Sequence, residues 1–349
     1  MIIITKTQEL IDFCKKCSAY EYVTLDTEFL RERTYYSKLC LVQMAHPGNT
    51  EDSAVLIDPL SPDLSLDPLY ELFKDPNVVK VFHAARQDLE IFFIDKKIIP
   101  FPFFDTQVAA MVCGFGEQVG YEKLVRSICN EGLDKSSRFT DWSARPLSNK
   151  QMHYAIGDVT YLREIYEFLS NKIKDNKRQA WVEEELKILM DPETYIFDPK
   201  YAWRRVKTRS SSWKMLAAIA ELAMFREKYA QQKNIPRNRV YKDDCMMELA
   251  ATRPKSLEDL NKSRLLLRDA RKGQIAEGIL NSIRQADKYK SNDVERQAPQ
   301  KEKAQGKEGL SELLRVLLKA KAEEFGVAAK LIATSADLDQ IAGGEKDLN

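Results

Sequence analysis

The pattern of hydrophobic positions divides the chain into a mixed first part and a helical second part. In the first hundred residues, short runs rich in β-branched and aromatic residues alternate with segments whose apolar residues recur at helical spacing. Runs of the first kind are typical of strands, and segments of the second kind are typical of helices. We predict strands at Met1–Thr5, Tyr22–Asp26, Leu39–Ala45, Ala54–Ile57, Val78–His83 and Pro102–Phe104. This order predicts a mixed α/β domain with its strands first.

The same periodicity predicts the helices of the first part. They lie at Gln8–Ala19, Asp88–Ile94, Gln107–Val112, Tyr121–Cys129, Leu147–Lys174 and Gln179–Leu189. The longest has Ser148 near its start and Gln151 three residues later, which is the pattern of a capping box. Gly157 inside this helix costs about 1 kcal/mol relative to alanine, and an interior glycine often marks a close approach to another group.

The second part of the chain is almost entirely helical. We predict helices at Ser212–Gln232, Asp243–Ala251, Ser256–Asn261 and Ala270–Ala286. Pro236 and Pro254 fall between them, which favours a compact helical bundle. Tyr289–Lys307 has few apolar residues and is predicted to be a flexible linker. The order of helix, break and acidic helix start in Leu216–Ala250 recurs in Leu313–Ala342, which indicates a partial second copy of the helical module.

The length of 349 residues is more than one core usually organises. We divide the chain into an α/β domain, a connector, a helical domain, a linker and a partial second helical domain, at 1–190, 191–210, 211–289, 290–308 and 309–349. The longest early apolar run, Met1–Ile4, is too short for a signal peptide or a membrane span. We therefore expect a cytoplasmic protein without a membrane partner.

Charge is distributed unevenly although the net charge is only +1. Residues 1–195 contain 23 Lys+Arg and 31 Asp+Glu, a net of −8, whereas residues 196–349 contain 31 and 22, a net of +9. The excess of positive charge is largest in residues 196–290, which contain 22 basic and 11 acidic residues. An acidic half that holds cations and a basic half that neutralises phosphates would suit an enzyme acting on a polyanion. An uneven solvated surface explains the charges equally well.

Cysteine and histidine offer little chemistry in this sequence. The six cysteines are irregularly spaced in a chain without an export signal, so we expect reduced thiols. Cys14 and Cys17 form a C-x-x-C pair on an apolar helix face, where core packing is favoured over redox or metal chemistry. The three histidines are scattered, so any metal must be held by oxygen ligands.

The most informative segment is an apolar strand that ends in two carboxylates, Asp26 and Glu28. Strand side chains repeat with a period of two, so both carboxylates share one face at the carboxyl end of the strand. Like charges at this spacing repel unless a cation lies between them, and carboxylates are natural ligands for Mg²⁺ and Mn²⁺. Alone, this pattern is a weak sign of a metal site.

Two further segments strengthen the hypothesis. Asp88 falls in the first turn of a helix that follows a strand, where it could also be a partner of the helix dipole. Tyr154 and Asp158 share a helix face at a spacing of four residues, where they could also be a half-buried structural pair. The structural explanation is favoured for each feature by itself, but it is harder to accept for all of them together.

In combination these motifs resemble the DEDD exonucleases. Leu25-Asp-Thr-Glu-Phe29 is similar to the first family motif, His83 to Asp88 to the second, and Tyr154-x-x-x-Asp158 to the tyrosine form of the third. The likeness is strongest to the ribonuclease D family, whose pattern is also resembled by Phe104-Asp-Thr-Gln107 and by Asp141-Trp-Ser-Ala-Arg-Pro-Leu147. The resemblance implies a ribonuclease H-like mixed sheet flanked by helices, followed by all-α helical-bundle modules.

The resemblance also implies a catalytic site and a reaction. Asp26, Glu28, Asp88 and Asp158 would hold two divalent cations, Mg²⁺ or Mn²⁺, and Tyr154 would orient the attacking water. Nucleotides would be removed one at a time from an RNA 3′ end as nucleoside 5′-monophosphates, by two-metal hydrolysis. Asp105 also falls in a family motif, but it precedes a helix as an N-cap would, so we expect it to be structural.

The helical module resembles a domain shared by RecQ-type helicases and ribonuclease D. The resemblance rests on Asn234-Ile-Pro-Arg-Asn238 and on Asp244–Ala250 within Trp213–Ala286, and it implies contact with nucleic acid. The sequence contains no G-x-x-x-x-G-K-[ST] motif, which excludes an ATP-driven helicase of the P-loop type. The second copy of this domain is shorter here than in the family.

We therefore expect a metal-dependent 3′→5′ exoribonuclease that trims the 3′ trailers of structured RNA such as tRNA precursors, without ATP. A DNA exonuclease of the same superfamily is an alternative, because metal ligands do not distinguish the ribose 2′-hydroxyl. A catalytically silent RNA-binding protein is a second alternative, although competent residues occupy all five catalytic positions.

Overall fold

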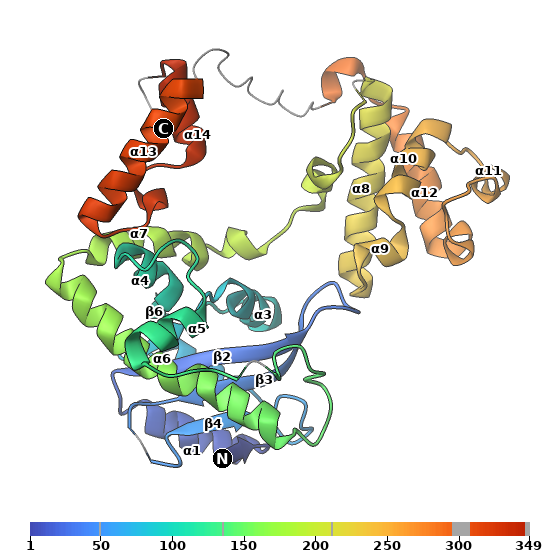
Figure 1. Cartoon of the computed structure of the whole chain (residues 1–349). Helices are drawn as coiled ribbons and strands as arrows, with labels where there is room; N and C mark the ends of the chain where they lie inside the picture. Colours follow the sequence, from blue (N-terminus) through green and yellow to red (C-terminus); the bar gives the residue numbers. More distant parts are fainter. Residues whose placement is uncertain (49, 135, 211, 295–307, 346–349) are drawn as a thin grey trace. The chain divides into compact units, whose positions relative to one another are not determined.

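The computed structural model describes residues 1–48, 50–134, 136–210, 212–294 and 308–345. They form two compact units (Figure 1). The first unit comprises Met1–Leu30, Leu39–Tyr195 and the C-terminal residues 308–345, and the second comprises Arg31–Lys38 and residues 196–294. The first unit is mixed α/β and the second is helical, as the hydrophobic pattern predicts.

A six-stranded sheet forms the centre of the first unit. Its strands are β1 (Ile2–Ile4), β2 (Tyr22–Leu30), β3 (Lys38–Ala45), β4 (Ala54–Ile57), β5 (Val79–Phe82) and β6 (Phe103–Asp105). The order β1-β4-β3-β2-β5-β6 is mixed: β3 pairs antiparallel with β4, whereas β1 with β4, β2 with β5 and β5 with β6 pair parallel. Because β2 and β5 are parallel, their carboxyl ends meet at one edge of the sheet.

Helices cover both faces of this sheet. They are α1 (Thr7–Cys17), α2 (Asp67–Lys74), α3 (Arg86–Lys96), α4 (Thr106–Val112), α5 (Tyr121–Leu124), α6 (Asn149–Asp175) and α7 (Gln179–Met190). The capping box is confirmed, because the Ser148 hydroxyl accepts from the Gln151 backbone N–H at 3.3 Å and the Gln151 side chain accepts from the Ser148 N–H at 3.0 Å. None of the helices in the described residues combines the length and apolar character that a membrane crossing requires.

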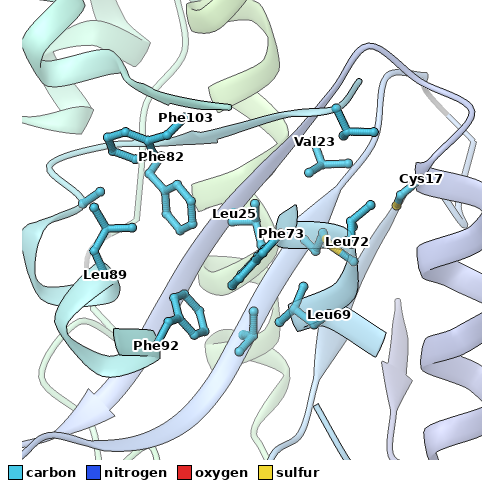
Figure 2. Close-up of a cluster of buried hydrophobic side chains, with 14 of the residues drawn as sticks. Cys17, Val23, Leu25, Leu69, Leu72, Phe73, Phe82, Leu89, Phe92 and Phe103 are labelled. Carbon is cyan, nitrogen blue, oxygen red and sulfur yellow. The ribbon is translucent and has the colours of Figure 1, made fainter. Parts of the chain in front are cut away.

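The core of this unit lies on both sides of the sheet. Figure 2 shows one side, where aromatic rings of α2, α3 and β5 belong to one buried cluster. Phe73 and Phe92 meet edge to face there, with ring centroids 4.9 Å apart. Cys14 and Cys17 are buried in this cluster as free thiols, which confirms their predicted packing role. On the opposite side, α6 packs against β2, β3 and β4 through Ala155 and Val159.

Three elements of this unit differ from the prediction. Strand β2 continues to Leu30, beyond the predicted end at Asp26. Helix α2 was not predicted, although Pro68 provides a helix-start signal in its first turn. The predicted helix Tyr121–Cys129 changes into a π-helical segment at Val125, so the helix is not one regular element.

The second unit is a helical bundle with short 3-10 segments. Its helices are α8 (Trp213–Lys233), α9 (Arg237–Val240), α10 (Asp243–Thr252), α11 (Leu257–Asn261) and α12 (Gly273–Ala286). The predicted helix Ala270–Ala286 is wrong at its start: a 3-10 turn at Arg268–Arg271 comes first, and Gly273 has φ +62°, which an α-helix cannot continue through. Of the predicted linker, residues 295–307 lie outside the described residues.

The loop Arg31–Lys38, which joins β2 to β3, belongs to the helical unit. The backbone N–H groups of Tyr35 and Tyr36 donate to the side-chain oxygen of Asn234 at 3.1 and 3.0 Å. The Tyr35 hydroxyl also donates to buried Glu227. The sequence pattern predicts a connection here but gives no sign of these partners.

The C-terminal helices α13 (Glu308–Phe325) and α14 (Ser335–Gly343) belong to the first unit. The Ala328 N–H donates to the Met111 carbonyl at 2.9 Å, and the Arg178 guanidinium donates to the Phe325 carbonyl at 2.6 Å. Gly114 has φ +82°, and a Cβ atom there would lie 2.7 Å from the Gly326 carbonyl oxygen. This close contact therefore requires glycine at position 114.

Candidate active site

Strand alternation determines where Asp26 and Glu28 point. Leu25 belongs to the core on the side of α1, α2 and α3. Its neighbour Thr24 faces the other way and donates its hydroxyl to the Val159 carbonyl of α6 at 2.7 Å. Because side chains alternate along a strand, Asp26 and Glu28 lie on the same side as Thr24. Both carboxylates of β2 are therefore directed to the side covered by α6.

Asp88 reaches this edge from the first turn of α3, which follows β5. The Thr27 hydroxyl donates to the Asp88 carboxylate, and both side chains are buried, at 5% and 6% exposure. Thr27 lies between the two carboxylates of β2 and points to the opposite face. It fixes α3 against β2, a role that the sequence analysis did not assign.

The turn between β5 and α3 is held by Asp105. Its carboxylate accepts the backbone N–H groups of Ala84 at 3.0 Å and Ala85 at 2.9 Å, and it caps α4 by accepting from Gln107 at 2.7 Å. Ala84 has φ +55°, a conformation that costs a non-glycine residue free energy. The predicted structural role of Asp105 agrees with this geometry, which also sets the start of the helix that carries Asp88.

Tyr154 and Asp158 lie one turn apart on α6 and line the same cavity. Burial and the charge of Asp158, which is 9% exposed, raise the pKa of Tyr154 above its ordinary value. Gly157, between them, makes no unusually close approach, because an added Cβ atom would be 3.7 Å from Leu133. Its carbonyl accepts from the Tyr121 hydroxyl at 2.9 Å, which ties α6 to α5.

All five predicted site residues line one cavity of about 640 Å³. One oxygen atom each of Asp26, Glu28 and Asp158 lie within 4.8 Å of one another. Asp88 lines the same cavity but is not part of this close group. Hard divalent cations prefer oxygen ligands, and clustered carboxylates repel one another unless a cation lies between them. The donor set therefore fits divalent metal ions such as Mg²⁺ or Mn²⁺.

Burial and mutual repulsion raise the pKa values of these carboxyl groups. Burial is the main cause for each group. It raises the pKa of Glu28 to about 9, with a further increase from Asp158 and Asp88. It raises the pKa of Asp88 to about 7 and that of Asp158 to about 7. The pKa of Asp26 is raised well above its ordinary value by burial and by the charges of Asp158, Asp88 and Glu28. Bound cations would stabilise the ionised carboxylates and so lower these pKa values.

Several residues of the cavity wall were not predicted to belong to the site. His83 and Tyr121 lie beside the carboxylates, with ring centroids 5.5 Å apart. Burial lowers the pKa of His83, so the ring is held neutral. Arg138 and Phe139 also line the cavity. They come from the loop before α6, where only the proximity of the Asp141-Trp142 motif indicated a role.

Family models match both units of the chain. Residues 1–174 match the model for 3′-5′ exonucleases, and this range contains all five predicted site residues. Residues 215–283 match the model for the HRDC domain, which corresponds to the bundle of α8 to α12. The two matches agree with the resemblance found from the sequence motifs.

Curated relatives and a solved structure extend the likeness to nearly the whole chain. A ribonuclease D of Jannaschia sp. is 58% identical over 344 residues, which are 99% of this chain and 89% of that protein. A ribonuclease D of Granulibacter bethesdensis is 45% identical over 341 residues, which are 97% of this chain and 85% of that protein. The crystal structure of Escherichia coli RNase D, an exoribonuclease involved in structured RNA processing, matches with a TM-score of 0.81 at 27% identity and covers 99% of this chain and 92% of that chain.

The fold, the carboxylate cavity and these comparisons lead to the same assignment. The chain is an enzyme, a 3′→5′ exoribonuclease that hydrolyses phosphodiester bonds. The chain belongs to the ribonuclease D family.

Proposed function

We propose that this enzyme trims the 3′ trailers of structured RNA such as tRNA precursors, one nucleotide at a time, and releases nucleoside 5′-monophosphates. The observation that carries the proposal is that Asp26, Glu28 and Asp158 converge in the cavity that Asp88 and Tyr154 also line. We assign the four carboxylates to holding two divalent cations, Mg²⁺ or Mn²⁺, and Tyr154 to orienting the attacking water.

The protein residues have separate tasks in this proposal. When bound, such cations supply an activated water and stabilise the leaving 3′ oxygen. Asp26, Glu28 and Asp158 offer oxygen ligands from two elements that Thr24 holds together through its bond to α6. Asp88 is kept in place by Thr27 and by the turn that Asp105 fixes. The site is therefore preorganised by hydrogen bonds outside the set of ligands.

Tyr154 is suited to orienting water because its phenol stays protonated. Burial and the charges of Asp158, Glu28 and Asp26 raise the pKa of Tyr154 above its ordinary value. The oxygen of a neutral hydroxyl has lone pairs that can accept hydrogen bonds. It can therefore accept a hydrogen bond from a water molecule without adding charge to the site.

The substrate class rests on the relatives and on the charge of the helical unit. The E. coli enzyme is described as acting in structured RNA processing. Residues 196–290 of this chain have an excess of 11 positive charges, from 22 basic and 11 acidic residues. Basic surface neutralises phosphates and is needed most for a long, folded RNA. These features support a tRNA-like precursor over a short oligonucleotide.

Two alternatives remain as outcomes of one experiment. A tRNA with a 3′ extension and the matching DNA, each labelled at both ends, are incubated with the protein in Mg²⁺, in Mn²⁺ or in chelator. We expect the 5′-labelled RNA to shorten one nucleotide at a time, the 3′ label to leave as a mononucleotide, and chelator to stop both. Faster DNA degradation would favour a DNA exonuclease, and binding without degradation would favour a catalytically silent protein.

A further inference from the structure

Phe139 is a large apolar side chain that lies at the active site and is almost fully exposed. Its side chain is 90% exposed, and it lines the same cavity as the carboxylates. Exposing a phenyl ring to water costs free energy, because burial of apolar surface is favourable. An aromatic ring presented at a nuclease cavity therefore suggests a flat apolar ligand group.

The residues around Phe139 are fixed although the ring is exposed. Ser137 and Trp142 on either side are buried, at 4% and 2% exposure. The Thr140 hydroxyl donates to the Ser137 carbonyl at 2.7 Å, and the Gln151 amide donates to the Thr140 hydroxyl at 3.1 Å. Gln151 belongs to the first turn of α6, the helix that carries Tyr154 and Asp158. The loop next to Phe139 is thus joined to the helix that carries Tyr154 and Asp158.

Arg138 adds a cation at the same place. Its guanidinium carbon lies 5.3 Å from the centroid of the Phe139 ring. Its charge also reaches the carboxylates, since it lowers the pKa values of Glu28 and Asp158. Within the described part of the chain it forms no salt bridge with a carboxylate. A guanidinium that lines the cavity beside an aromatic ring can bind a phosphate group.

We propose that Phe139 stacks on the 3′-terminal base of the RNA while Arg138 contacts the backbone phosphate next to that base. The proposal rests on the function proposed above, because it places the terminal nucleotide in the carboxylate cavity. Aromatic stacking accepts every base, as an enzyme that removes successive nucleotides requires. The pair would act as positioning residues that set how the chain end enters the site.

The test compares RNAs that differ only in one base. A single-stranded RNA with a normal 3′ end, one with a 3′-terminal abasic residue and one with a penultimate abasic residue are degraded under single-turnover conditions. The wild-type enzyme should lose roughly 5- to 100-fold in kcat/KM on the terminal abasic RNA, as expected when one base no longer stacks on an aromatic ring. For Phe139→Ala, kcat/KM on normal RNA should fall by the same factor, because KM rises. Its kcat/KM on the terminal abasic RNA should not fall further.

Matched variants separate stacking from folding and from general binding. Phe139→Trp should restore discrimination against the abasic end, whereas Phe139→Leu should not. Phe325→Ala is the control, because that ring is 52% exposed with Lys321 at 5.9 Å from its centroid and does not line the cavity. Arg138→Gln should lower the log–log salt slope of binding by about 0.7, the value for one phosphate contact on a single strand.

The outcomes that overturn the proposal differ from failure of the proposed function. Equal discrimination by wild type and Phe139→Ala would show that Phe139 does not contact the terminal base. Discrimination at the penultimate base alone would also overturn the assignment. Metal-dependent degradation of normal RNA by the wild type is measured in the same assay. Its absence would reject the proposed function itself.

Discussion

At the scale of residues, the site consists of carboxylates and of neighbouring side chains that orient them. The Thr27 hydroxyl donates a hydrogen bond to Asp88, and Tyr154 lies one turn from Asp158 on α6. The proposed site residues could be predicted from the sequence because Asp26 and Glu28 share a strand face, Tyr154 and Asp158 share a helix face, and the motifs together resemble those of the DEDD exonucleases. The role of Thr27 was not predictable, because a threonine in a strand gives no sign of its hydrogen-bond partner.

Tyr154→Phe tests the orienting role. We expect near wild-type affinity for metal and RNA, because the carboxylates and the ring are intact. Turnover should fall by about 10²- to 10⁴-fold, the usual contribution of a positioned proton-handling group. Single-turnover cleavage at saturating metal, measured beside a metal titration, checks this. Full activity, or a loss that added metal rescues, would contradict the assignment.

The pH dependence of the metal-free protein follows from the raised carboxyl pKa values. The unfolded chain releases these protons near pH 4, whereas Asp88 and Asp158 keep them to about pH 7 and Glu28 to about pH 9. The native state therefore binds more protons between these values, so stability falls as pH rises. In chelator, we expect the thermal midpoint to fall from pH 6 to pH 9, and Asp158→Asn should weaken this fall. A midpoint that rises over this range would contradict the electrostatic account.

At the scale of elements, the site residues lie on β2, α3 and α6, and turns fix the positions of these elements. The strands and the long helix were predictable from periodicity, including the cap at Ser148. Two features were not predictable, because they depend on backbone conformation at single residues. They are the hydrogen bonds from Ala84 and Ala85 to the Asp105 carboxylate and the interruption at Gly273. Tertiary partners also place loop Arg31–Lys38 with the helical unit, which local sequence cannot reveal.

Asp105→Ala tests the importance of the turn before α3. The substitution removes a helix cap and leaves the N–H groups of Ala84 and Ala85 without their acceptor, so we expect a loss of about 2–4 kcal/mol in unfolding free energy. Ser256→Ala, which removes only the cap of α11, should cost about 1 kcal/mol. Urea denaturation of both variants measures the difference. Equal losses would show that Asp105 is no more than a cap.

At the scale of the whole molecule, acidic residues are in excess in the first part of the chain and basic residues in the second. The first 195 residues have a net charge of −8, from 23 basic and 31 acidic residues, and the remainder has a net charge of +9, from 31 and 22. In the helical unit, the charges of Lys200 and Arg204 lie 4.6 and 4.4 Å from the Tyr201 ring. Cations beside a half-exposed aromatic ring are suited to single-stranded RNA.

Lys200→Gln with Arg204→Gln tests whether this unit contacts the substrate. For every phosphate that the variant no longer neutralises, the log–log salt slope of RNA binding should fall by about 0.7–0.9. Lys74→Gln is the control, because it removes a cation from the acidic first unit. Lys74 is ion-paired with Glu71 at 2.7 Å, as Lys200 is with Asp198 at 3.1 Å, so the two sites are matched in pairing. Binding of a tRNA precursor across a salt series gives both slopes. A slope that the double variant leaves unchanged would mean that these residues do not contact RNA.

The most direct measurement of the central claim is the activity of Asp26→Asn and Asp158→Asn beside their stability. The account predicts that neither variant degrades RNA at a Mg²⁺ concentration that saturates the wild type, because each loses a proposed ligand. Both should keep the wild-type fold, with a thermal midpoint in chelator that is unchanged or higher, since the substitution relieves repulsion among the carboxylates. Retained turnover in either variant at matched Mg²⁺ would contradict the account.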